Sequence, residues 1–309
     1  MTEGRGPATV RVRAAGKINL TLRVGPRRPD GYHPLATVFQ AVSVYDDIEV
    51  RHAAPRTFPV TVSGPQAHLV PTDGRNLVVR AAELLAEAYG DPGRLGARIA
   101  IRKAIPVTGG MAGGSADCAG ALLALSVLWD LDVTPAELAD LGGRLGADVP
   151  FALMGQTAFG AGRGDELVPV LSRGTYHWVL ALADFELSTP AVFGRFDQLN
   201  PHPPLPPVQP PAELLEALAS GDPVRLSRVL VNDLQEAALD LRPGLARTIA
   251  AGRDAGALAS VVSGSGPTVA FLAASESAAI DLSTALSGAG VCRTVKRVTG
   301  PVPGARLLS

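Results

Sequence analysis

The chain has 309 residues, which is enough for two domains and a large hydrophobic core. Its formal net charge of −1 and its aromatic content of 5% exclude a basic nucleic-acid-binding surface and an extended platform for base stacking. The two cysteines, Cys118 and Cys292, are far apart and lie in no metal-binding spacing, which indicates small buried side chains rather than a disulfide scaffold or a zinc site.

No segment predicts export or membrane insertion. Residues 1–15 are polar, contain arginines and lack the apolar core of a secretory signal peptide. The longest uncharged run, residues 255–275, is interrupted by glycines, serines and Pro267, so it is not expected to span a membrane. We therefore expect a soluble, cytoplasmic protein with no membrane partner and no nucleic-acid partner.

The first 51 residues predict strands and one loop. Apolar or alternating runs indicate strands at 9–14, 20–24, 38–44 and 47–51. A short turn containing Gly16, Lys17 and Asn19 is expected between the first two strands, and residues 45–46 join the last two. Residues 26–34, Pro-Arg-Arg-Pro-Asp-Gly-Tyr-His-Pro, are expected to form a loop.

The middle of the chain predicts helices around one strand. Residues 97–102 resemble a strand, whereas helical spacing at 76–89 and a continuous apolar run at 118–131 indicate helices. Residues 134–137, Thr-Pro-Ala-Glu, form a capping box with proline at the first helical position, so a further helix is expected to run to Leu145.

The composition changes near Arg163, and we expect two domains, residues 1–165 and 166–309. Residues 201–211 contain seven prolines, so they are either an extended surface connector or a ligand for a peptide-recognition module. Because strands and helices are mixed without regular alternation, the sequence predicts the α+β class. Further strands are expected at 176–183, 269–272 and 292–298, and further helices at 212–219, 243–254 and 279–286.

The most informative segment is residues 105–117, Ile-Pro-Val-Thr-Gly-Gly-Met-Ala-Gly-Gly-Ser-Ala-Asp, which joins an expected strand to an expected helix. Glycines let backbone N–H groups crowd together, and a helix start adds unpaired donors and the positive end of the helix dipole. The segment therefore predicts a phosphate cradle, and a nucleotide as ligand. The alternative is a flexible turn, but four glycines within six residues are more than a turn requires.

This glycine-rich loop differs from two common nucleotide-binding motifs. It lacks the Gly-Lys-Ser/Thr ending of the P-loop and the Gly-x-Gly-x-x-Gly dinucleotide fingerprint. No Lys or Arg lies between Lys103 and Arg144, so phosphate charge must be met by backbone dipoles, a metal ion and cations from elsewhere in the chain. A second glycine loop, residues 263–268, is either a hairpin turn or another place where the backbone approaches a ligand.

Several polar residues have both a structural and a functional interpretation. Lys17, in Ala-Ala-Gly-Lys-Ile-Asn-Leu, is either a surface charge or a desolvated functional cation. Asp148 is either a turn residue or a rigidly held base, and Pro150 is expected to keep Val149 extended. His33 is either a surface imidazole or part of a site, because it lies in a loop where core packing explains little.

The glycine loop resembles the phosphate loop of the GHMP small-molecule kinases. Three further segments, residues 15–20, 28–33 and 145–151, resemble the 4-diphosphocytidyl-2-C-methyl-D-erythritol kinase family within that superfamily. The loop at 263–268 is similar to the C-terminal glycine loop of the same family. The matching segments run in the expected order from about residue 10 to residue 298, and Asp-Gly-Tyr-His within 28–33 is the most specific of them.

The resemblance implies a fold and an activity. The fold would combine an N-terminal GHMP kinase domain, ribosomal-protein-S5-domain-2-like, with a ferredoxin-like C-terminal domain, and the active site would lie in the cleft between them. The reaction would be ATP-dependent phosphorylation of the 2-hydroxyl of 4-diphosphocytidyl-2-C-methyl-D-erythritol in the non-mevalonate (MEP) pathway to isoprenoids. ATP would be the co-substrate, and Mg²⁺ would bridge its phosphates.

The resemblance also assigns roles to individual residues. Lys17 and Asp148 match the catalytic pair, and Asn19 matches a substrate contact. The cytidine would lie by Tyr32 and His33, with Phe193 facing Tyr32 across the base. The expected ATP-binding residues surround the adenine or carry the phosphates: Asn76, Leu77, Lys103, Pro106, Val107, Thr108, Gly109, Gly110, Met111, Ala112, Gly113, Gly114, Ser115 and Ala116.

The glycine loop also departs from the family pattern. Many relatives have Gly-Leu-Gly-Gly-Gly-Ser-Ser where this chain has Gly-Met-Ala-Gly-Gly-Ser-Ala. Ala112 adds a methyl group and is expected to lose the freedom for positive φ that glycine has. Ala116 lacks a hydroxyl, which leaves Ser115 as the hydroxyl of this loop that could reach a metal ion; the metal ligands are otherwise unassigned. The cradle is expected to survive, because most of its donors are backbone groups.

Overall fold

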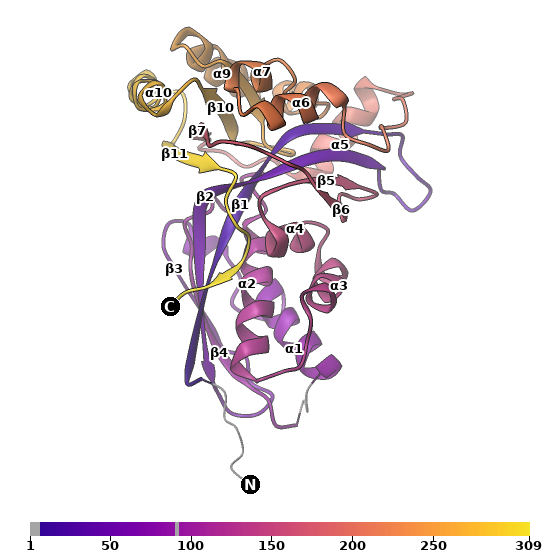
Figure 1. Ribbon diagram of the computed structural model, residues 1–309, viewed down its shortest axis with the longest axis vertical. Coiled ribbons are helices and arrows are strands. Elements are labelled where there is room, and N and C mark those ends of the chain that lie inside the picture. Colours follow the sequence, from indigo (N-terminus) through magenta and orange to yellow (C-terminus); the bar gives the residue numbers. More distant parts are fainter. Residues whose placement is uncertain (1–6, 90–92) are drawn as a thin grey trace.

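The computed structural model describes residues 7–89 and 93–309. In this part of the chain the strands form a mixed sheet of eight strands and a second sheet of four, with helices packed on both (Figure 1). The expected α+β class is confirmed. No helix of the described residues is both long and apolar enough to cross a membrane.

The first sheet is built around two long antiparallel strands, β1 (Thr9–Val24) and β2 (Leu35–His52). Helix α2 packs directly on this pair and is buried on most sides, because α1 and α3 cover it (Figure 1). The other elements of this part are β3 (Val60–Ser63), the 3-10 turn Ala67–Leu69, α1 (Leu77–Tyr89), β4 (Ala97–Arg102), α2 (Gly113–Leu128), α3 (Pro135–Leu145), α4 (Val149–Met154), β5 (Thr157–Ala161) and β6 (Glu166–Pro169).

The second sheet is antiparallel, in the order β11-β7-β10-β9. Helices α9 and α10 pack on it, and a second apolar cluster fills the space between them. Its elements and the segments around them are β7 (Tyr176–Leu182), α5 (Thr189–Leu199), α6 (Ala212–Ser220), α7 (Pro223–Ser227), β8 (Val231–Asn232), α8 (Gln235–Leu241), α9 (Gly244–Asp254), β9 (Ala259–Val262), β10 (Val269–Ala273), α10 (Glu276–Ala289), β11 (Thr294–Gly300) and β12 (Arg306–Leu307).

Three strands that follow residue 165 join the first sheet. β6 pairs with β5, β8 pairs with β1, and the C-terminal β12 pairs with the outer edge of β1. In Figure 1 the chain descends from β11 to β12 along the first sheet. The expected boundary at 165/166 therefore stays a prediction.

The turn expected around Gly16 is wrong. β1 continues through it, with register shifts at Ala15/Gly16 and Asn19/Thr21. A glycine within a strand suits such a bulge and a close neighbour, and a Cβ on Gly16 would lie 3.1 Å from Val44 Cγ1. Lys17 therefore lies on a paired strand.

Two further local expectations are corrected. β2 runs without a break through residues 45–46. The buried Asp46 carboxylate pairs with Lys103 and does not form a turn. Val149 is helical rather than extended: it begins α4, where Pro150 is tolerated because the first turn leaves backbone N–H groups without intrahelical partners. Asp148, with φ −85° and ψ −7°, is the N-cap residue of this helix.

Other expectations are confirmed. The capping box at Thr134 and Glu137 is present at the start of α3. Residues 201–211 contain no helix or strand, and Leu205 and Val208 in this segment are exposed. The short helices α7 and α8, and helix α5 with its Thr-Pro start, were not predicted.

Candidate active site

A cavity of about 690 Å³ lies between the first sheet and the loop that joins β9 and β10. It is lined by β1, the glycine loop, the start of α1, the residues before α4, the start of α5, and the second glycine loop. The structure therefore brings together the segments around Lys17, Asp148 and the two glycine loops, which are up to about 250 residues apart in sequence, whereas no residue of the loop 28–33 lines the cavity.

The glycine loop has an unusual backbone. Thr108, Gly110 and Ala112 have φ values of 53°, 73° and 55°, so positive φ recurs at every second residue. Ala112 adopts this conformation despite its methyl group, which corrects the expectation that alanine would lose it; left-handed backbone costs a non-glycine residue roughly 1–2 kcal/mol. Such strain is concentrated at ligand sites.

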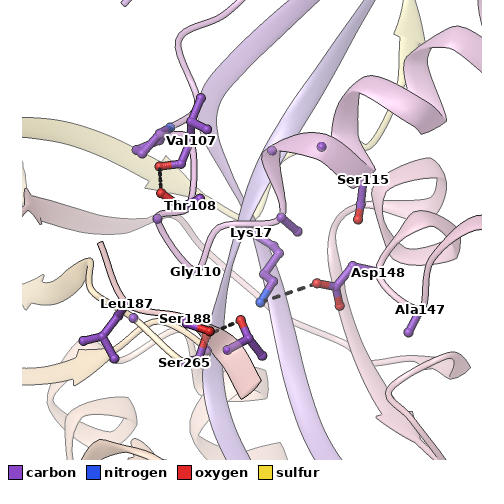
Figure 2. A pocket seen from close by; sticks show the side chains of 18 of the residues that line it. Lys17, Val107, Thr108, Gly110, Ser115, Ala147, Asp148, Leu187, Ser188 and Ser265 are labelled. Carbon is purple, nitrogen blue, oxygen red and sulfur yellow. Dashed lines mark hydrogen bonds and ion pairs between the residues drawn. The ribbon is translucent and has the colours of Figure 1, made fainter. Parts of the chain in front are cut away.

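Ala112 is the N-cap residue of α2 and makes no side-chain capping hydrogen bond. The first backbone N–H groups of α2 therefore remain available to an anion beside the loop, and the helix dipole favours negative charge there. Ser115 lies in this first turn and its side chain lines the cavity (Figure 2). Met111 and Ala116, in contrast, are buried and do not line it.

The two glycine loops touch each other. Ser263 Oγ donates to the carbonyl oxygen of Gly110 over 3.0 Å, and a Cβ on Gly110 would lie 2.0 Å from the Ser263 carbonyl oxygen. Thr189 Oγ1 and Ser265 Oγ form a hydrogen bond of 2.8 Å, which ties the second loop to α5 (Figure 2). The second loop joins the antiparallel strands β9 and β10, which confirms the hairpin turn. It also lines the cavity, and its approach to a ligand stays a prediction.

Lys17 and Asp148 face each other inside the cavity (Figure 2). Lys17 Nζ lies 3.9 Å from Asp148 Oδ2 and donates to Asn19 Oδ1 over 2.8 Å. Asn19 in turn donates to Thr37 Oγ1 over 2.8 Å, which fixes its amide oxygen toward the lysine. The Lys17 side chain is 8% exposed and that of Asp148 is 33% exposed, so a ligand can reach the carboxylate.

Burial lowers the pKa of Lys17 from its ordinary value, and the Asp148 carboxylate partly opposes this shift. A desolvated ammonium acts on a neighbouring charge more strongly than one in water, because little solvent screens it. Lys17 is therefore desolvated and not a surface charge, and its functional role stays a prediction.

Lys103 is held by two carboxylates that the sequence analysis missed. Its Nζ lies 2.5 Å from Asp46 Oδ2 and 2.6 Å from Asp117 Oδ2, and all three side chains are buried. Asp46 Oδ1 also accepts from the backbone N–H groups of Ala104 and Ile105, which lead into the glycine loop. The pKa of Asp117 is raised well above its ordinary value, mainly by burial and secondly by the nearby Asp46 carboxylate.

The residues expected around the adenine lie along one wall. Asn76, Leu77 and Lys103 line the cavity. The Asn76 side chain bridges the backbone, donating to the Pro71 carbonyl over 2.6 Å and accepting from Val78 N–H over 3.0 Å. Arg75, next to them, also lines the cavity.

The residues expected around the cytidine are only partly brought together. His33 packs against Phe193 with ring centroids 5.0 Å apart, and it is held by Gly25 O at 2.9 Å and Asp197 Oδ1 at 3.4 Å. Phe193 lines the cavity, but the ring beside it is His33 and not Tyr32. Tyr32 is 57% exposed, and neither it nor His33 lines the cavity. The guanidinium of Arg163, which does line the cavity, lies over the Tyr32 ring.

Comparisons with known proteins give the same picture. The family models for the GHMP kinases N terminal domain and the GHMP kinases C terminal domain match residues 76–156 and 214–292. The chain is 55% identical to the 4-diphosphocytidyl-2-C-methyl-D-erythritol kinase of Rhodococcus jostii over 98% of this chain and 96% of that protein. It is 54% identical to the Mycobacterium tuberculosis protein of the same name, over 97% and 93%.

Solved structures agree with these sequence relatives. A crystal structure of 4-(cytidine 5'-diphospho)-2C-methyl-D-erythritol kinase has a TM-score of 0.75 and 34% identity, and the match covers 94% of this chain and 99% of that one. A homoserine kinase from Cytophaga hutchinsonii has a TM-score of 0.74, with full coverage of both chains, but at 17% identity it supports the fold alone. The chain therefore has the GHMP kinase fold and belongs to the 4-diphosphocytidyl-2-C-methyl-D-erythritol kinase family of that superfamily.

Proposed function

We propose that this protein transfers the γ-phosphoryl group of ATP to the 2-hydroxyl of 4-diphosphocytidyl-2-C-methyl-D-erythritol. This reaction would be a step of the MEP pathway to isoprenoid precursors and would take place in the cytoplasm. The observation that carries the proposal is the Lys17–Asp148 pair, 3.9 Å apart, in one cavity with a glycine-rich anion cradle. The names of the relatives supply the substrate.

In this proposal the nucleotide occupies the wall formed by the first domain. The adenine lies near Asn76, Leu77 and Lys103, and the triphosphate follows the backbone of residues 106–116 to the start of α2. The free N–H groups of that helix start and the positive φ values in the loop support this placement. The domains themselves are proposed as residues 1–165 and 166–309, and the two family models lie on either side of that boundary.

The cytidylyl substrate would enter at the opposite end of the cavity. Tyr32, His33 and Phe193 supply the aromatic surface there, and Asn19 contacts the substrate near the reacting hydroxyl. Thr189 and Ser265 connect this end with the second glycine loop.

A magnesium ion fits the oxygen ligands at the site. Mg²⁺ usually keeps several waters and binds through one or two protein groups together with substrate phosphates. In the described residues no group of three or more His, Cys, Asp or Glu side chains is arranged to hold a metal by itself. Ser115 would hold the ion, because its hydroxyl lines the cavity at the start of α2 (Figure 2). When bound, Mg²⁺ would neutralise phosphate charge.

The protein side chains would prepare the acceptor alcohol. Asp148 would accept the proton of the 2-hydroxyl, or orient that hydroxyl, while Lys17 offsets negative charge near the transferred group. Phosphoryl transfer depends mainly on in-line positioning and charge stabilisation, which a fixed carboxylate and a buried ammonium provide.

ADP release in the presence of different alcohols tests the proposal. The full chain is incubated with ATP and Mg²⁺ and, separately, the cytidylyl substrate, mevalonate, homoserine or galactose. We expect rapid ADP release with the cytidylyl substrate alone. Preferred turnover of another alcohol would refute the substrate assignment, and ATP binding without turnover of any of them would indicate a sensor.

The alkaline side of the pH profile should report Lys17. Because burial lowers its pKa from 10.5, Lys17 loses its charge at a lower pH than an exposed lysine does. We expect kcat to fall as pH rises above that lowered pKa, by about tenfold per pH unit. When the kcat values of Lys17→Arg are scaled to their own maximum, the fall in kcat should occur at a higher pH than in the wild type, because arginine stays charged. An unmoved alkaline limb would assign it to another group.

Replacing Tyr32 with alanine should weaken binding of the cytidylyl substrate. Stacking of a base on an aromatic ring is worth roughly 1–3 kcal/mol, which corresponds to a KM increase of about 5- to 150-fold. The KM for ATP should stay the same, because Tyr32 is not among the residues proposed to hold the nucleotide. An unchanged KM for the cytidylyl substrate would place the cytidine elsewhere.

A further inference from the structure

The turn between β5 and β6 carries an arginine into the substrate end of the cavity. Gly162 and Gly164, on either side of Arg163, have φ values of 66° and 93°, which glycine adopts readily. Leu35 N–H donates to the Gly162 carbonyl over 2.8 Å, so the turn is attached to the first residue of β2. The backbone of Arg163 is therefore fixed beside the loop that ends at residue 34.

The guanidinium of Arg163 lies over Tyr32. Its Cζ atom is 5.6 Å from the centroid of the Tyr32 ring, and the residue lines the cavity. Among the hydrogen bonds of residues 7–89 and 93–309, the guanidinium makes one, from Nη2 to Asp165 Oδ2 over 3.0 Å. A guanidinium has five N–H donors, so most of them remain free for a ligand.

The other cationic side chains that line the cavity, within the described residues, are neutralised by a carboxylate or lie away from Tyr32. Lys103 is neutralised by two buried carboxylates, and Lys17 faces Asp148. Arg75 pairs with Asp73 and stands directly before Asn76, at the adenine end of the proposed nucleotide site. Arg163 is thus the cavity-lining cation that stands beside Tyr32.

We propose that Arg163 binds the diphosphate group of the cytidylyl substrate. This inference rests on the proposed function, because the ligand is the substrate of that reaction. A pyrimidine on Tyr32 places its diphosphate one ribose away, within the reach of a long side chain anchored over the same ring. The planar guanidinium can pair two N–H groups with two phosphate oxygens, which a lysine ammonium does not match in geometry. The contact also adds selectivity for a diphosphate over an uncharged nucleoside.

Binding of CDP and of cytidine to the full chain tests the assignment. Calorimetry gives the Kd for CDP, and displacement of CDP gives the Kd for cytidine. Arg163→Ala should raise the Kd for CDP by about 10- to 100-fold, the range for a hydrogen bond to a charged group, and the Kd for cytidine by less than about threefold. Arg163→Lys should lie between the wild type and Arg163→Ala.

Arg195→Ala is the matched control. Arg195 also loses an ion pair when replaced, with Asp240 at 2.6 Å, and it lies on the same helix as Phe193, but it does not line the cavity. Both Kd values should stay within about twofold of the wild type. Arg163→Gln, compared with the wild type in thermal unfolding, shows whether a loss of CDP binding comes from a loss of folding.

Steady-state kinetics separate this inference from the proposed function. If Arg163 binds the diphosphate, Arg163→Ala raises the KM for the cytidylyl substrate and leaves kcat and the KM for ATP unchanged. An equal loss of affinity for CDP and for cytidine would show that Arg163 acts through Tyr32, and an unchanged affinity for CDP would remove Arg163 from the site. Either result would overturn this inference. The proposed function would still stand if the wild-type protein phosphorylates the cytidylyl substrate. A wild-type protein that neither binds CDP nor phosphorylates the cytidylyl substrate would overturn both.

Discussion

Replacing Asp148 with asparagine is expected to lower kcat by roughly 10²- to 10⁴-fold, the usual contribution of a general base. Asparagine has the same shape but cannot accept the proton of the acceptor alcohol. The KM for ATP should change little, because the nucleotide is held mainly by backbone groups of the glycine loop. Coupled ADP release with saturating cytidylyl substrate measures the effect.

Two comparisons make this result specific. Asp240→Asn removes a partly exposed carboxylate from the Arg195 ion pair, outside the cavity, and should leave kcat unchanged. A preserved substrate KM in Asp148→Asn would show that the loss lies in the chemical step. Near-normal turnover of Asp148→Asn would remove this residue from the chemistry.

Replacing Lys103 with methionine is expected to reduce the free energy of unfolding by about 3–5 kcal/mol, the cost of leaving buried charge without its partner. Asp46 and Asp117 would then face each other across an apolar side chain. Urea unfolding followed by circular dichroism measures the change as a lower midpoint. The double variant Lys103→Met with Asp117→Asn should recover part of the loss, because one carboxylate is gone.

The destabilisation in Lys103→Met should depend on pH. Burial and the nearby Asp46 raise the pKa of Asp117 in the folded protein, and removal of the Lys103 ammonium, which lowers this pKa, raises it further above that in the unfolded chain. The unfolded state then ionises at lower pH, so the variant loses stability as pH rises and approaches the wild type in acid. An equal loss at pH 4 and pH 8 would contradict the proposed origin of the effect.

Much of the fold could be predicted from local signals. The capping box at Thr134, the strand Ala97–Arg102 and the proline-rich connector at 201–211 follow from residue preferences that act over a few positions. Gly16 misled the prediction of β1, because a glycine in a strand bulge and a glycine in a turn have the same local signature. Asp46 misled the prediction of β2, because an acidic residue between two apolar runs indicates a connection between strands. Its partner Lys103 is distant in sequence, so the local pattern does not show that the carboxylate is paired.

The candidate site could be predicted only where motifs identify it. Local context left Lys17 and Asp148 open, because the distance between them depends on how α4 packs against β1. The family resemblance gives both residues a catalytic role, which stays a prediction. Arg163 had no signal, since an arginine in a Gly-Arg-Gly turn resembles an ordinary surface residue. Its significance comes from the ring of Tyr32 and the cavity wall, and both depend on tertiary structure.

The register of β1 limits where residues can be inserted into this protein or deleted from it. Side chains of a strand alternate between its faces, so one residue inserted or deleted between Ala15 and Lys17 would turn the ammonium of Lys17 to the opposite face from the part of β1 that precedes it. The exposed connector at 201–211 has no paired backbone register of this kind. Engineers who need a tag or a longer linker can therefore place it in the connector, whereas this short stretch of β1 has a fixed length.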